Sequence, residues 1–400
     1  MGVCKLRVLV LGAGRMGTAV AKDLIDSGVK AAVGERRRES LGLCVAKVKS
    51  PKLETFEVDA SNRDSLTKLL KRGDFDVVVN ALPHEISVPA LKAEIDAGVN
   101  VVDMVFEDDQ LKLGDKAKDR GVTVIPGCGV APGLSNMLTG YGASKVNSVD
   151  KVRIMCGGLP QEPTPPLYYK VVFHLESVWA MYARRARIVV NGEIREVDAL
   201  SGLELVEFPS VGKFEGFYTD GLSTLLYTFK ENEKFREVKE MVEKTLRYPG
   251  HVEKIKTLME CGLLDIEPIN VREGKISPRE FLTALLTPKL ELGDERDMLV
   301  MRVEVVGDNE CKHYTFDLVD YYDRVGEVTS MARTTGYTAS IVAQLIGNGK
   351  IEEKGIVTPE ELGMRDIFRI ILDQLSKREI KVKGFYSETF SSLLPTDPTV

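Results

Sequence analysis

The chain has 400 residues, 44% of them hydrophobic and 28% charged, which is typical of a globular protein with two or three packed units. Its formal charge of -6 comes from acidic and basic residues scattered along the chain, and this excludes a dominant basic surface for nucleic acid. No apolar run has the length of a membrane-spanning helix or a secretory leader. We therefore expect a cytoplasmic protein that binds a small molecule, with neither nucleic acid nor membrane as partner.

Short apolar segments alternate with amphipathic ones over residues 1–128, a pattern typical of a parallel sheet covered by helices. The run from Leu6 to Leu11 predicts the first strand, and residues 18–27 predict a helix that ends at Gly28. Further strands are expected at 30–34, 53–58, 76–80, 99–103 and 122–125, with helices at 64–71, 88–97 and 109–120. The expected fold class is α/β, with a Rossmann doubly wound parallel sheet over residues 1–128.

The glycine- and proline-rich segment at 126–136 marks the first domain boundary, and the pattern of expected strands and helices changes after it. Residues 129–325 predict an inserted α+β domain with a mostly antiparallel sheet. Its expected strands are 152–156, 168–173, 186–190 and 298–306, its expected helices are 231–244 and 251–260, and residues 157–166 are expected to form a stiff loop. Residues 326–400 predict a C-terminal helical return to the Rossmann domain, with helices at 329–345 and 358–376.

The segment GAGRMG carries a glycine motif between the first strand and the first helix. Gly12 permits the tight turn, Gly14 lets the backbone approach a pyrophosphate, and Gly17 lets helix and strand pack closely. Arg15 and Met16 begin the helix, whose N-terminus favours an anion. The motif in this context predicts a dinucleotide-binding site, the alternative being a glycine turn of another α/β protein.

The residues after the second and third strands bear on which dinucleotide binds. Glu35 is placed to accept hydrogen bonds from the adenosine ribose and to repel a 2′-phosphate, which favours NAD. Arg36 and the two arginines that follow it are able to clamp that phosphate, so NADP stays possible. Asp59 and Ala60, which follow the third strand, are expected near the adenine. We predict NAD as cofactor and leave NADP open.

The loop after the fourth strand is expected to contact the nicotinamide half of the cofactor, because ligands of such sheets bind at the carboxyl ends of the strands. The residues concerned are Asn80, Ala81, Leu82 and Pro83. His84 follows them and titrates near neutrality, which suits proton transfer, although a histidine in a loop often serves as a hydrogen-bonding support.

Several separated segments give the chain a family resemblance. They are GAGRMG at 12–17, NALPH at 80–84, NVVDM at 100–104, GVAPGLSN at 129–136, GGLP at 157–160, TLRYPGH at 245–251 and SMARTTGY at 330–337. With these segments the chain resembles the saccharopine dehydrogenase superfamily, and within it most closely the L-lysine 6-dehydrogenase type. The resemblance implies a Rossmann domain, an inserted substrate domain through whose sheet a homodimer forms, and a C-terminal return.

The resemblance also implies chemistry at a carbon that bears an amino group. NAD(P)+ takes a hydride from that carbon, and water hydrolyses the imine; for L-lysine the products are allysine, which cyclises to piperideine-6-carboxylate, and ammonia. Hydride loss needs an unprotonated amine, so a positioned base is expected. Asp103, which the family places near substrate and nicotinamide, is one candidate, and a capping carboxylate is its alternative role. His84 is the other catalytic candidate.

The resemblance implies three substrate contacts in the inserted domain. Glu176 falls where relatives carry a charged substrate residue, and a carboxylate suits an amino group. Arg247 is expected to hold the substrate carboxylate as a two-pronged fork, with His251 beside it. The alternatives are a solvated glutamate, and a helix-breaking corner at 247–251 whose arginine bonds backbone carbonyls.

Two other functions stay open. One is a saccharopine or carboxynorspermidine-type reductase, although such enzymes usually prefer NADP and Glu35 departs from that pattern. The other is a nucleotide-sensing Rossmann protein without turnover. The six cysteines show no metal-ligand or disulfide spacing, so no metal is expected, and Cys128 has no identifiable base for thiol catalysis.

Overall fold

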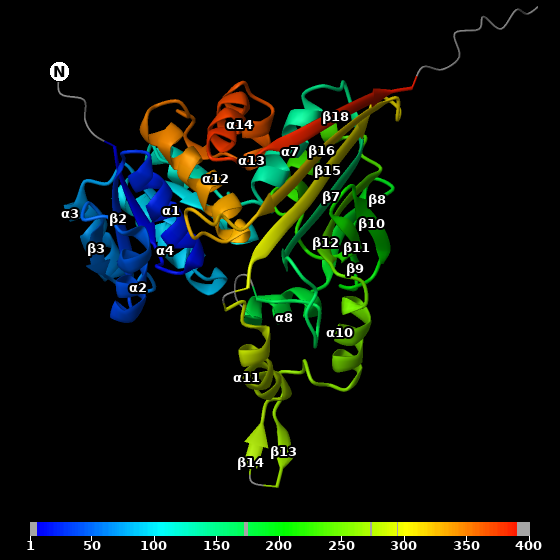
Figure 1. Ribbon diagram of the computed structural model, residues 1–400. Coiled ribbons are helices and arrows are strands. Elements are labelled where there is room, and N and C mark those ends of the chain that lie inside the picture. The colour runs from blue at the N-terminus through cyan, green and yellow to red at the C-terminus, as the bar shows by residue number, and fades with distance from the viewer. Residues whose placement is uncertain (1–5, 172–174, 273, 294, 390–400) are drawn as a thin grey trace, which may run out of the picture.

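The computed structural model describes residues 6–171, 175–272, 274–293 and 295–389. The chain forms two large sheets, which stand on the left and right of Figure 1. One cluster of buried residues includes Val8 and Val10 of the first sheet and Val305 and Phe316 of the second, so the two sheets share a continuous core. The predicted class, a Rossmann parallel sheet with an inserted α+β domain, is confirmed.

The first sheet has seven parallel strands in the order β17-β6-β5-β4-β1-β2-β3. Its central strands are buried on both faces, as expected for a parallel sheet with helices on each side. The strands that come from the first 128 residues are β1 (Arg7–Leu11), β2 (Lys30–Glu35), β3 (Glu54–Glu57), β4 (Val77–Asn80), β5 (Asn100–Asp103) and β6 (Thr123–Ile125).

The helices of this domain connect its strands and cover the sheet. They are α1 (Arg15–Asp26), α2 (Arg38–Val48), α3 (Arg63–Gly73), α4 (His84–Ala97), α5 (Asp108–Leu111) and α6 (Gly114–Asp119). Helix α2 is not among the predicted elements; only Leu41, Cys44 and Val48 of it are buried, which leaves a weak apolar pattern. Helix α4 begins at His84, four residues before the predicted start.

The second sheet has nine strands, and all of its pairs are antiparallel except that of β12 with β7. Its strands are β7 (Val149–Pro160), β8 (Ala186–Val190), β9 (Glu193–Val197), β10 (Glu204–Phe208), β11 (Gly212–Tyr218), β12 (Glu240–Arg247), β15 (Asp297–Gly307), β16 (Lys312–Tyr321) and β18 (Val382–Glu388).

Five α-helices, a short 3-10 helix and a hairpin complete the inserted domain among the described residues. They are α7 (Leu134–Ala143), α8 (Leu175–Ala183), α9 (Leu225–Glu231), η1 (Glu233–Phe235), α10 (His251–Glu260), α11 (Pro278–Leu290) and the hairpin of β13 (Ile269–Val271) and β14 (Gly274–Ile276). The hairpin projects from the bottom of the molecule in Figure 1.

Five predictions for local structure are wrong. The single helix expected at 109–120 is two helices, α5 and α6, separated by a turn at residues 112–113. The expected helix at 231–244 is strand β12 from Glu240 onward, and residues 157–160 of the expected loop continue strand β7. Residues 168–171 form a turn and one isolated bridge in place of a strand, and the rest of that expected strand lies outside the described residues. The single helix expected at 358–376 is two helices, α13 (Pro359–Gly363) and α14 (Ile367–Lys377).

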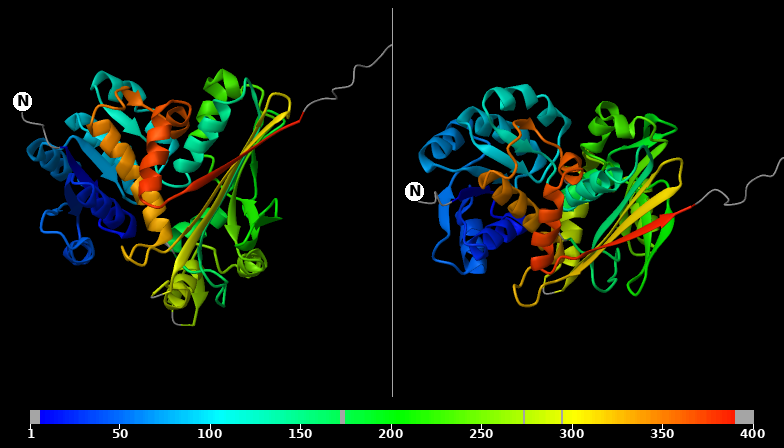
Figure 2. Two further views of the ribbon diagram at one scale, coloured as in Figure 1. Left: turned by 45° about the horizontal axis from the view of Figure 1, so that its top comes forward. Right: turned by 90° about the horizontal axis from the view of Figure 1, so that it is seen from above.

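The C-terminal segment returns to both sheets. Helix α12 (Ser330–Gly347) packs on α1, and a Cβ at Gly336 would lie 3.1 Å from the Ala19 side chain, so a larger residue there would crowd this contact. The two-residue strand β17 (Gly355–Ile356) then pairs with β6 of the first sheet. Strand β18 pairs with β16 and lies as the red strand at the edge of the second sheet in both views of Figure 2.

Candidate active site

The glycine turn has the geometry that a dinucleotide requires. Gly12 has a φ of +99°, and a Cβ there would lie 2.5 Å from the carbonyl oxygen of Ala81. A Cβ at Gly17 would lie 1.9 Å from the carbonyl oxygen of Gly12, whereas one at Gly14 would meet nothing within 4 Å. The first and third glycines are therefore demanded by packing, and the second borders open space. Helix α1 begins there at Arg15 without a side-chain cap, so its N-terminus fits a pyrophosphate.

Glu35 ends strand β2 beside this turn. Its two carboxylate oxygens accept hydrogen bonds from the backbone N–H groups of Ala13 and Arg37, each at 3.1 Å. Arg36 is exposed next to it, and its charge helps to lower the pKa of Asp59, after the hydrogen bonds that Asp59 accepts from Ser61. Glu35, Arg36, Asp59 and the buried Ala60 thus follow β2 and β3 at one edge of the sheet, where the adenosine half is predicted.

Asn80 and Asp103 end the neighbouring strands β4 and β5 and belong to one buried network. The Asp103 carboxylate accepts hydrogen bonds from Ser87 Oγ at 2.7 Å, the Val105 N–H at 2.9 Å, Gln110 Nε2 at 3.0 Å and Asn80 Nδ2 at 3.3 Å. Burial raises the pKa of Asp103 to about 6, against the lowering effect of these bonds. Two of the four donors, the Val105 N–H and Gln110, follow β5, so the Asp103 carboxylate fixes the loop after β5.

Glu94 is a second buried carboxyl in this network, and the sequence analysis missed it. Its Oε2 accepts a hydrogen bond of 3.1 Å from Asn80 Nδ2, and burial followed by the nearby charge of Asp103 raises its pKa to about 8. The neutral form therefore predominates at pH 7. A glutamate within the helical pattern 84–97 resembles a solvated residue, and only the tertiary fold shows that it points inward.

His84 lies at the exposed side of the network formed by Asn80, Glu94 and Asp103. It begins α4 after Pro83, and its Nδ1 lies 2.5 Å from Glu107 Oε1. His84 also acts electrostatically on Asp103, so the two catalytic candidates lie near one another. Cys128 is fully buried, and burial raises the pKa of its thiol, which agrees with the expectation of an unreactive cysteine.

The three predicted substrate residues lie in the second domain. Glu176 lies in the first turn of helix α8, and its Oε1 accepts a hydrogen bond of 2.7 Å from Thr283 Oγ1 of α11, so it joins two helices. Arg247 and His251 are buried and share Tyr182: the hydroxyl lies 3.2 Å from Arg247 Nε and 2.8 Å from His251 Nε2. The structure brings Arg247 and His251 together, and gives Glu176 a partner on another element.

His251 is held neutral by its surroundings. Burial, and then the charge of Arg247, lower its pKa to about 3, and its Nδ1 lies 2.7 Å from the carbonyl oxygen of Leu167. Arg247 donates one hydrogen bond to the Leu246 carbonyl and lies over the ring of Tyr169. Among the described residues no carboxylate forms an ion pair with Arg247. A buried guanidinium of this kind suits an incoming carboxylate.

Strand β12 also carries Glu243, a third functional candidate that the sequence analysis missed. Because side chains alternate along a strand, Glu243, Thr245 and Arg247 lie on one face. Cys156 of β7 is paired with Thr245 on that face. Glu243 is 6% exposed, and burial raises its pKa to about 8. We refer to these four residues together with Thr219 as the Glu243 cluster.

Two contacts bring the first domain against this region. Arg187 of β8 binds Asp220, which follows Thr219, and also Asp108 of α5 at 2.6 Å. A Cβ at Gly127, in the loop after β6, would lie 3.2 Å from the Ser223 hydroxyl. The loops at the carboxyl ends of β5 and β6 therefore meet the segment 219–223, which packs on Glu243.

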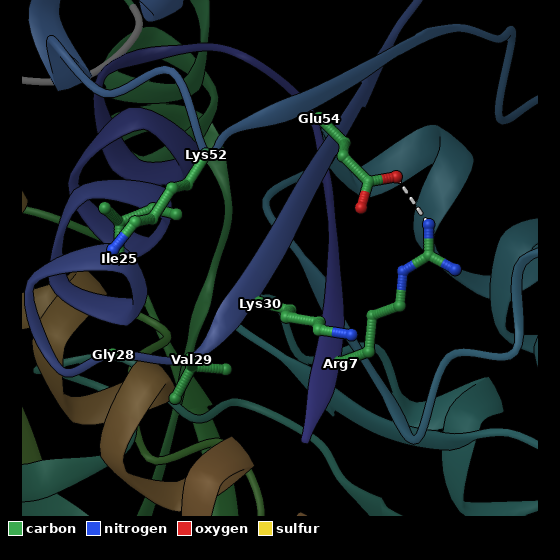
Figure 3. A pocket seen from close by; sticks show the side chains of 7 residues that line it. All are labelled: Arg7, Ile25, Gly28, Val29, Lys30, Lys52 and Glu54. Carbon is green, nitrogen blue, oxygen red and sulfur yellow. Dashed lines mark hydrogen bonds and ion pairs between the residues drawn. The ribbon is translucent and has the colours of Figure 1, made fainter. Parts of the chain in front are cut away.

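A hollow in the described structure lies away from the glycine turn. It encloses about 480 Å³ and is lined by Arg7, Ile25, Gly28, Val29, Lys30, Lys52 and Glu54, as Figure 3 shows. These residues begin β1, β2 and β3, so the hollow is at the edge of the sheet opposite to the glycine turn. Arg7 is already paired with Glu54 there.

The described residues show neither a metal cluster nor a membrane span. They contain no group of three or more His, Cys, Asp or Glu side chains arranged to hold a metal ion. Within the same part of the chain, no helix combines the length and the apolar character needed to cross a membrane.

Comparison with known proteins agrees with this geometry. Carboxyaminopropylagmatine dehydrogenase of Synechocystis sp. is 24% identical over 381 residues, covering 89% of this chain and 92% of that protein. The mitochondrial alpha-aminoadipic semialdehyde synthase of Bos taurus is 25% identical over 97% of this chain, which spans 48% of that longer protein. The solved apo saccharopine dehydrogenase (L-Glu forming) of Saccharomyces cerevisiae has the same fold, with a TM-score of 0.77 and 22% identity over 95% of this chain and 99% of that one.

Two family domains together cover most of the chain. Residues 8–125 match the saccharopine dehydrogenase NADP binding domain, and residues 129–380 match the saccharopine dehydrogenase C-terminal domain. The first domain is accordingly an NAD(P)-binding domain, and the chain is that of an oxidoreductase. The protein belongs to the saccharopine dehydrogenase family.

Proposed function

We propose that the protein oxidises the side-chain amine of an amino acid with NAD+, and that the substrate is L-lysine, deaminated at its ε-carbon. The products are allysine, which cyclises to piperideine-6-carboxylate, together with ammonia and NADH. The observation that carries this proposal is the composition of the buried face of β12. It presents a single guanidinium, Arg247, without a carboxylate partner among the described residues, and a single buried carboxyl, Glu243. One carboxylate and one remote amine on the substrate match that pair.

The cofactor supplies the hydride acceptor, and the residues around it position and hold protons. Asp103 fixes the loop 104–110 through the four hydrogen bonds that it accepts, so in this proposal it is a positioning residue. His84 and Glu107, at the exposed end, exchange protons with water. Ala81, Leu82 and Pro83 would contact the nicotinamide half, and the fully buried Asn80 supports their loop through Glu94 and Asp103. Arg15 and Met16 would bind the pyrophosphate through backbone N–H groups.

The preference for NAD over NADP is part of the proposal. Glu35 has its carboxylate beside the turn, where it would meet the ribose hydroxyls and repel a 2′-phosphate. Of the three arginines that follow it, Arg38 is engaged by Glu57 at 2.5 Å and Arg37 lies 3.7 Å from Glu35 itself. Arg36 is therefore the one that stays available to a phosphate, and one exposed arginine is a weak clamp.

The second candidate function is a secondary-amine dehydrogenase of the saccharopine or carboxynorspermidine type. The names of the similar proteins favour it, since they include a carboxyaminopropylagmatine dehydrogenase and a saccharopine dehydrogenase. Saccharopine carries three carboxylates, and each would need a cationic or multiple hydrogen-bonding partner. Beside the segment that bonds Glu243, Arg187 is already paired with Asp220 and Asp108, and Arg184 lies 3.9 Å from the same Asp220.

The test is the absorbance of the reduced nicotinamide with purified protein, NAD+ or NADP+, and a panel of amines. The panel contains L-lysine, L-ornithine, saccharopine, Nα-acetyl-lysine and Nε-acetyl-lysine. We expect reduction of NAD+ with L-lysine, one ammonia per NADH, and no reaction with Nε-acetyl-lysine, whose nitrogen lone pair is delocalised. Turnover of saccharopine alone would assign the second candidate function. Binding of NADH with no turnover of any amine would indicate a nucleotide-sensing protein.

We also propose a homodimer formed through the second sheet. Its edge strand β18 has an unpaired outer edge within the described structure, and Phe385 and Tyr386 on it are 55% and 51% exposed. The substrate and cofactor proposed are small water-soluble metabolites, in keeping with a cytoplasmic enzyme. Light scattering of the purified protein should give twice the chain mass of 44.2 kDa, and Phe385→Asp should reduce it to one chain. A wild-type monomer at micromolar concentration would contradict the dimer.

A further inference from the structure

The Glu243 cluster combines groups that seldom share a buried sheet face. Glu243, Thr245 and Arg247 are 6%, 6% and 3% exposed, and each has a polar or charged side chain. Positions of this kind in a central strand are ordinarily apolar, because burying a polar group without a partner costs free energy. Their presence on β12 needs a reason beyond stability.

The Glu243 carboxyl is hydrogen-bonded but lacks a cation. Its Oε2 accepts a hydrogen bond of 2.5 Å from Thr219 Oγ1, which also lies 2.8 Å from Thr245 Oγ1, and the backbone of Gly221 bonds it too. No Lys, Arg or His of the described residues forms an ion pair with it. A buried carboxyl of this kind is the site that a desolvated ammonium group would favour.

The groups around Glu243 come from three elements. Asp220, on the loop after β11, adds a second negative charge, Arg247 of β12 adds a positive one, and Cys156 of β7 adds a thiol. Burial raises the pKa of Cys156 to about 12, so the thiol is neutral at physiological pH. Asp220 is in turn neutralised by Arg187. Glu243, whose pKa burial raises to about 8, is therefore the group of the cluster that titrates nearest to neutrality.

Glu243 also faces the correct domain. The segment 219–221, which bonds Glu243, continues to Ser223. Arg187 pairs with both Asp220 of this segment and Asp108 of the first domain, and Ser223 lies directly against the loop at Gly127. Those loops follow β5 and β6 at the carboxyl edge of the first sheet, where the nicotinamide of a bound dinucleotide lies in this architecture. A substrate held at the Glu243 cluster would thus present its amine-bearing carbon to the cofactor.

We propose that Glu243 binds the amino group of the substrate and takes a proton from it. The ammonium N–H bond breaks and a carboxyl O–H bond forms. The nitrogen lone pair then makes the C=N bond as the hydride leaves the carbon for the oxidised nicotinamide. This inference rests on the proposed amine oxidation and assigns its base, a role for which the sequence analysis had named Asp103 and His84.

The assignment of Glu243 as base can be measured as a proton released when the substrate binds. In the free protein the Glu243 pKa of about 8 keeps the carboxyl protonated at pH 7. When an ammonium group enters, the buried pair is stable only with one proton fewer, either as carboxylate with ammonium or as carboxyl with amine. Binding of L-lysine below pH 8 must therefore release a proton, and the released fraction must fall as the pH rises through the pKa.

The experiment compares wild type, Glu243→Gln, Glu243→Asp and a matched control, Glu240→Gln, whose side chain lies on the same strand but on its opposite face. Calorimetric titration of the NADH complex with L-lysine, in buffers of different ionisation enthalpy, counts protons released. Kinetics between pH 6.5 and 10 give kcat and KM separately. The Tm and the Kd for NADH report whether fold and cofactor site survive.

We expect wild type to release close to one proton per lysine at pH 7. Glu243→Gln should release none and should lose roughly 100-fold or more in kcat/KM, the usual contribution of a general base. Its Tm at pH 7 should be equal to or above that of wild type, because glutamine lacks the ionisable carboxyl whose raised pKa lowers stability as the pH rises. Its Kd for NADH should be unchanged, and Glu243→Asp should recover part of the loss in kcat/KM. Glu240→Gln should behave as wild type. Glu243→Gln with a wild-type pH profile and proton count would overturn the assignment, as would an equal loss of NADH affinity.

The outcomes separate this inference from the proposed function. If no amine is oxidised but lysine binds with a proton release that Glu243→Gln abolishes, the site stands and the oxidation fails. If wild type and Glu243→Gln oxidise lysine equally, the function stands and the base lies elsewhere. Absence of both binding and turnover overturns both proposals.

Discussion

Glu35 is the residue at which the choice of cofactor can be tested. Charged hydrogen bonds of the kind expected between its carboxylate and the ribose hydroxyls contribute about 1.5–3 kcal/mol each. We expect Glu35→Ala to weaken NADH binding roughly tenfold or more and to leave NADPH binding unchanged or stronger. Titration of nicotinamide fluorescence with each cofactor measures both values.

The ratio of the two affinities is the informative quantity in that experiment. Glu35 also accepts the Ala13 N–H in the turn, and any loosening of the turn would weaken both cofactors equally. Arg37→Ala is the control, since its side chain is 70% exposed and its backbone N–H remains. An unchanged ratio in Glu35→Ala would contradict the role assigned to this carboxylate.

Glu94 predicts a pH dependence of stability. Its pKa is raised from an ordinary 4.5 to about 8 in the folded protein, so between these values the unfolded chain has released a proton that the folded chain retains. Stability contributed through this group therefore falls as pH rises through that window, by at most about 1.4 kcal/mol per pH unit. Glu94→Gln should flatten the fall in Tm between pH 5 and 8.

The control for this change is Glu85→Gln, on an exposed position of the same helix. Some slope should persist in Glu94→Gln because the Glu243 carboxyl, with a pKa also raised to about 8, acts in the same direction. A Tm profile identical to wild type would show that Glu94 is ionised in the folded protein.

At the scale of the element, two glycines of the strand–turn–helix at the cofactor site have different roles: Gly17 is needed for folding and Gly14 for binding. A Cβ at Gly17 would collide with the Gly12 carbonyl oxygen, so Gly17→Ala should cost about 1–3 kcal/mol of stability or more. Gly14 has an ordinary φ of -71° and open space around it. We expect Gly14→Ala to keep the Tm and to weaken NADH binding roughly tenfold, about 1.4 kcal/mol.

Differential scanning fluorimetry and NADH titration on the two variants test this contrast. A Gly14→Ala protein with a lowered Tm and normal affinity would reverse the roles of the two glycines. A Gly17→Ala protein with wild-type Tm would show that the turn can relax by more than an ångström.

The elements best predicted from sequence are those whose local pattern agrees with their environment. Strands β1, β4 and β5 are short apolar runs buried on both faces, and the glycine motif with Glu35 needs only local spacing to be recognised. The candidate site in the second domain depends on an element that the pattern disguises. All residues of β12 from Met241 to Arg247 are buried, yet Glu243, Lys244, Thr245 and Arg247 are polar or charged, so the sequence of this buried strand resembles that of a solvent-exposed segment.

The carboxyls were missed for a related reason. Glu94 and Glu243 are buried by elements far away in the chain, and no local feature distinguishes them from solvated glutamates. The pairing of β12 with β7 and β11 outweighed its helical propensity, as tertiary contacts commonly do. Violations of local pattern at these positions are what one expects where function has constrained the sequence.

At the scale of the whole molecule, the two sheets should unfold together. They share one core cluster, and α12 packs against α1, β4, β5 and β15. The single tryptophan, Trp179, lies in the second domain and is 1% exposed, whereas the cofactor turn lies in the first. Saturation with NAD+ at about 100 times its Kd should stabilise the native state by roughly 2.7 kcal/mol. We expect this to raise the Trp179 transition itself.

Thermal melts followed by tryptophan emission and by far-ultraviolet circular dichroism test that expectation. Coincident transitions that move together with NAD+ indicate one cooperative unit. A Trp179 transition that stays in place while a separate circular dichroism transition rises would show two independently melting domains. Gly14→Ala serves as the control, because it should melt as wild type without cofactor and respond weakly to NAD+.

The route of the C-terminal segment has a consequence for synthesis of the protein. The backbone of Glu353, next to β17, accepts a hydrogen bond from Thr123 beside it, and 230 positions of sequence separate the two residues. A ribosome that has just made the whole nucleotide-binding half has not yet made the strand that covers β6. The outer edge of β6 therefore stays unpaired while the entire second domain is translated. In a nascent chain stalled before residue 355, this edge would be an exposed strand to which chaperones bind.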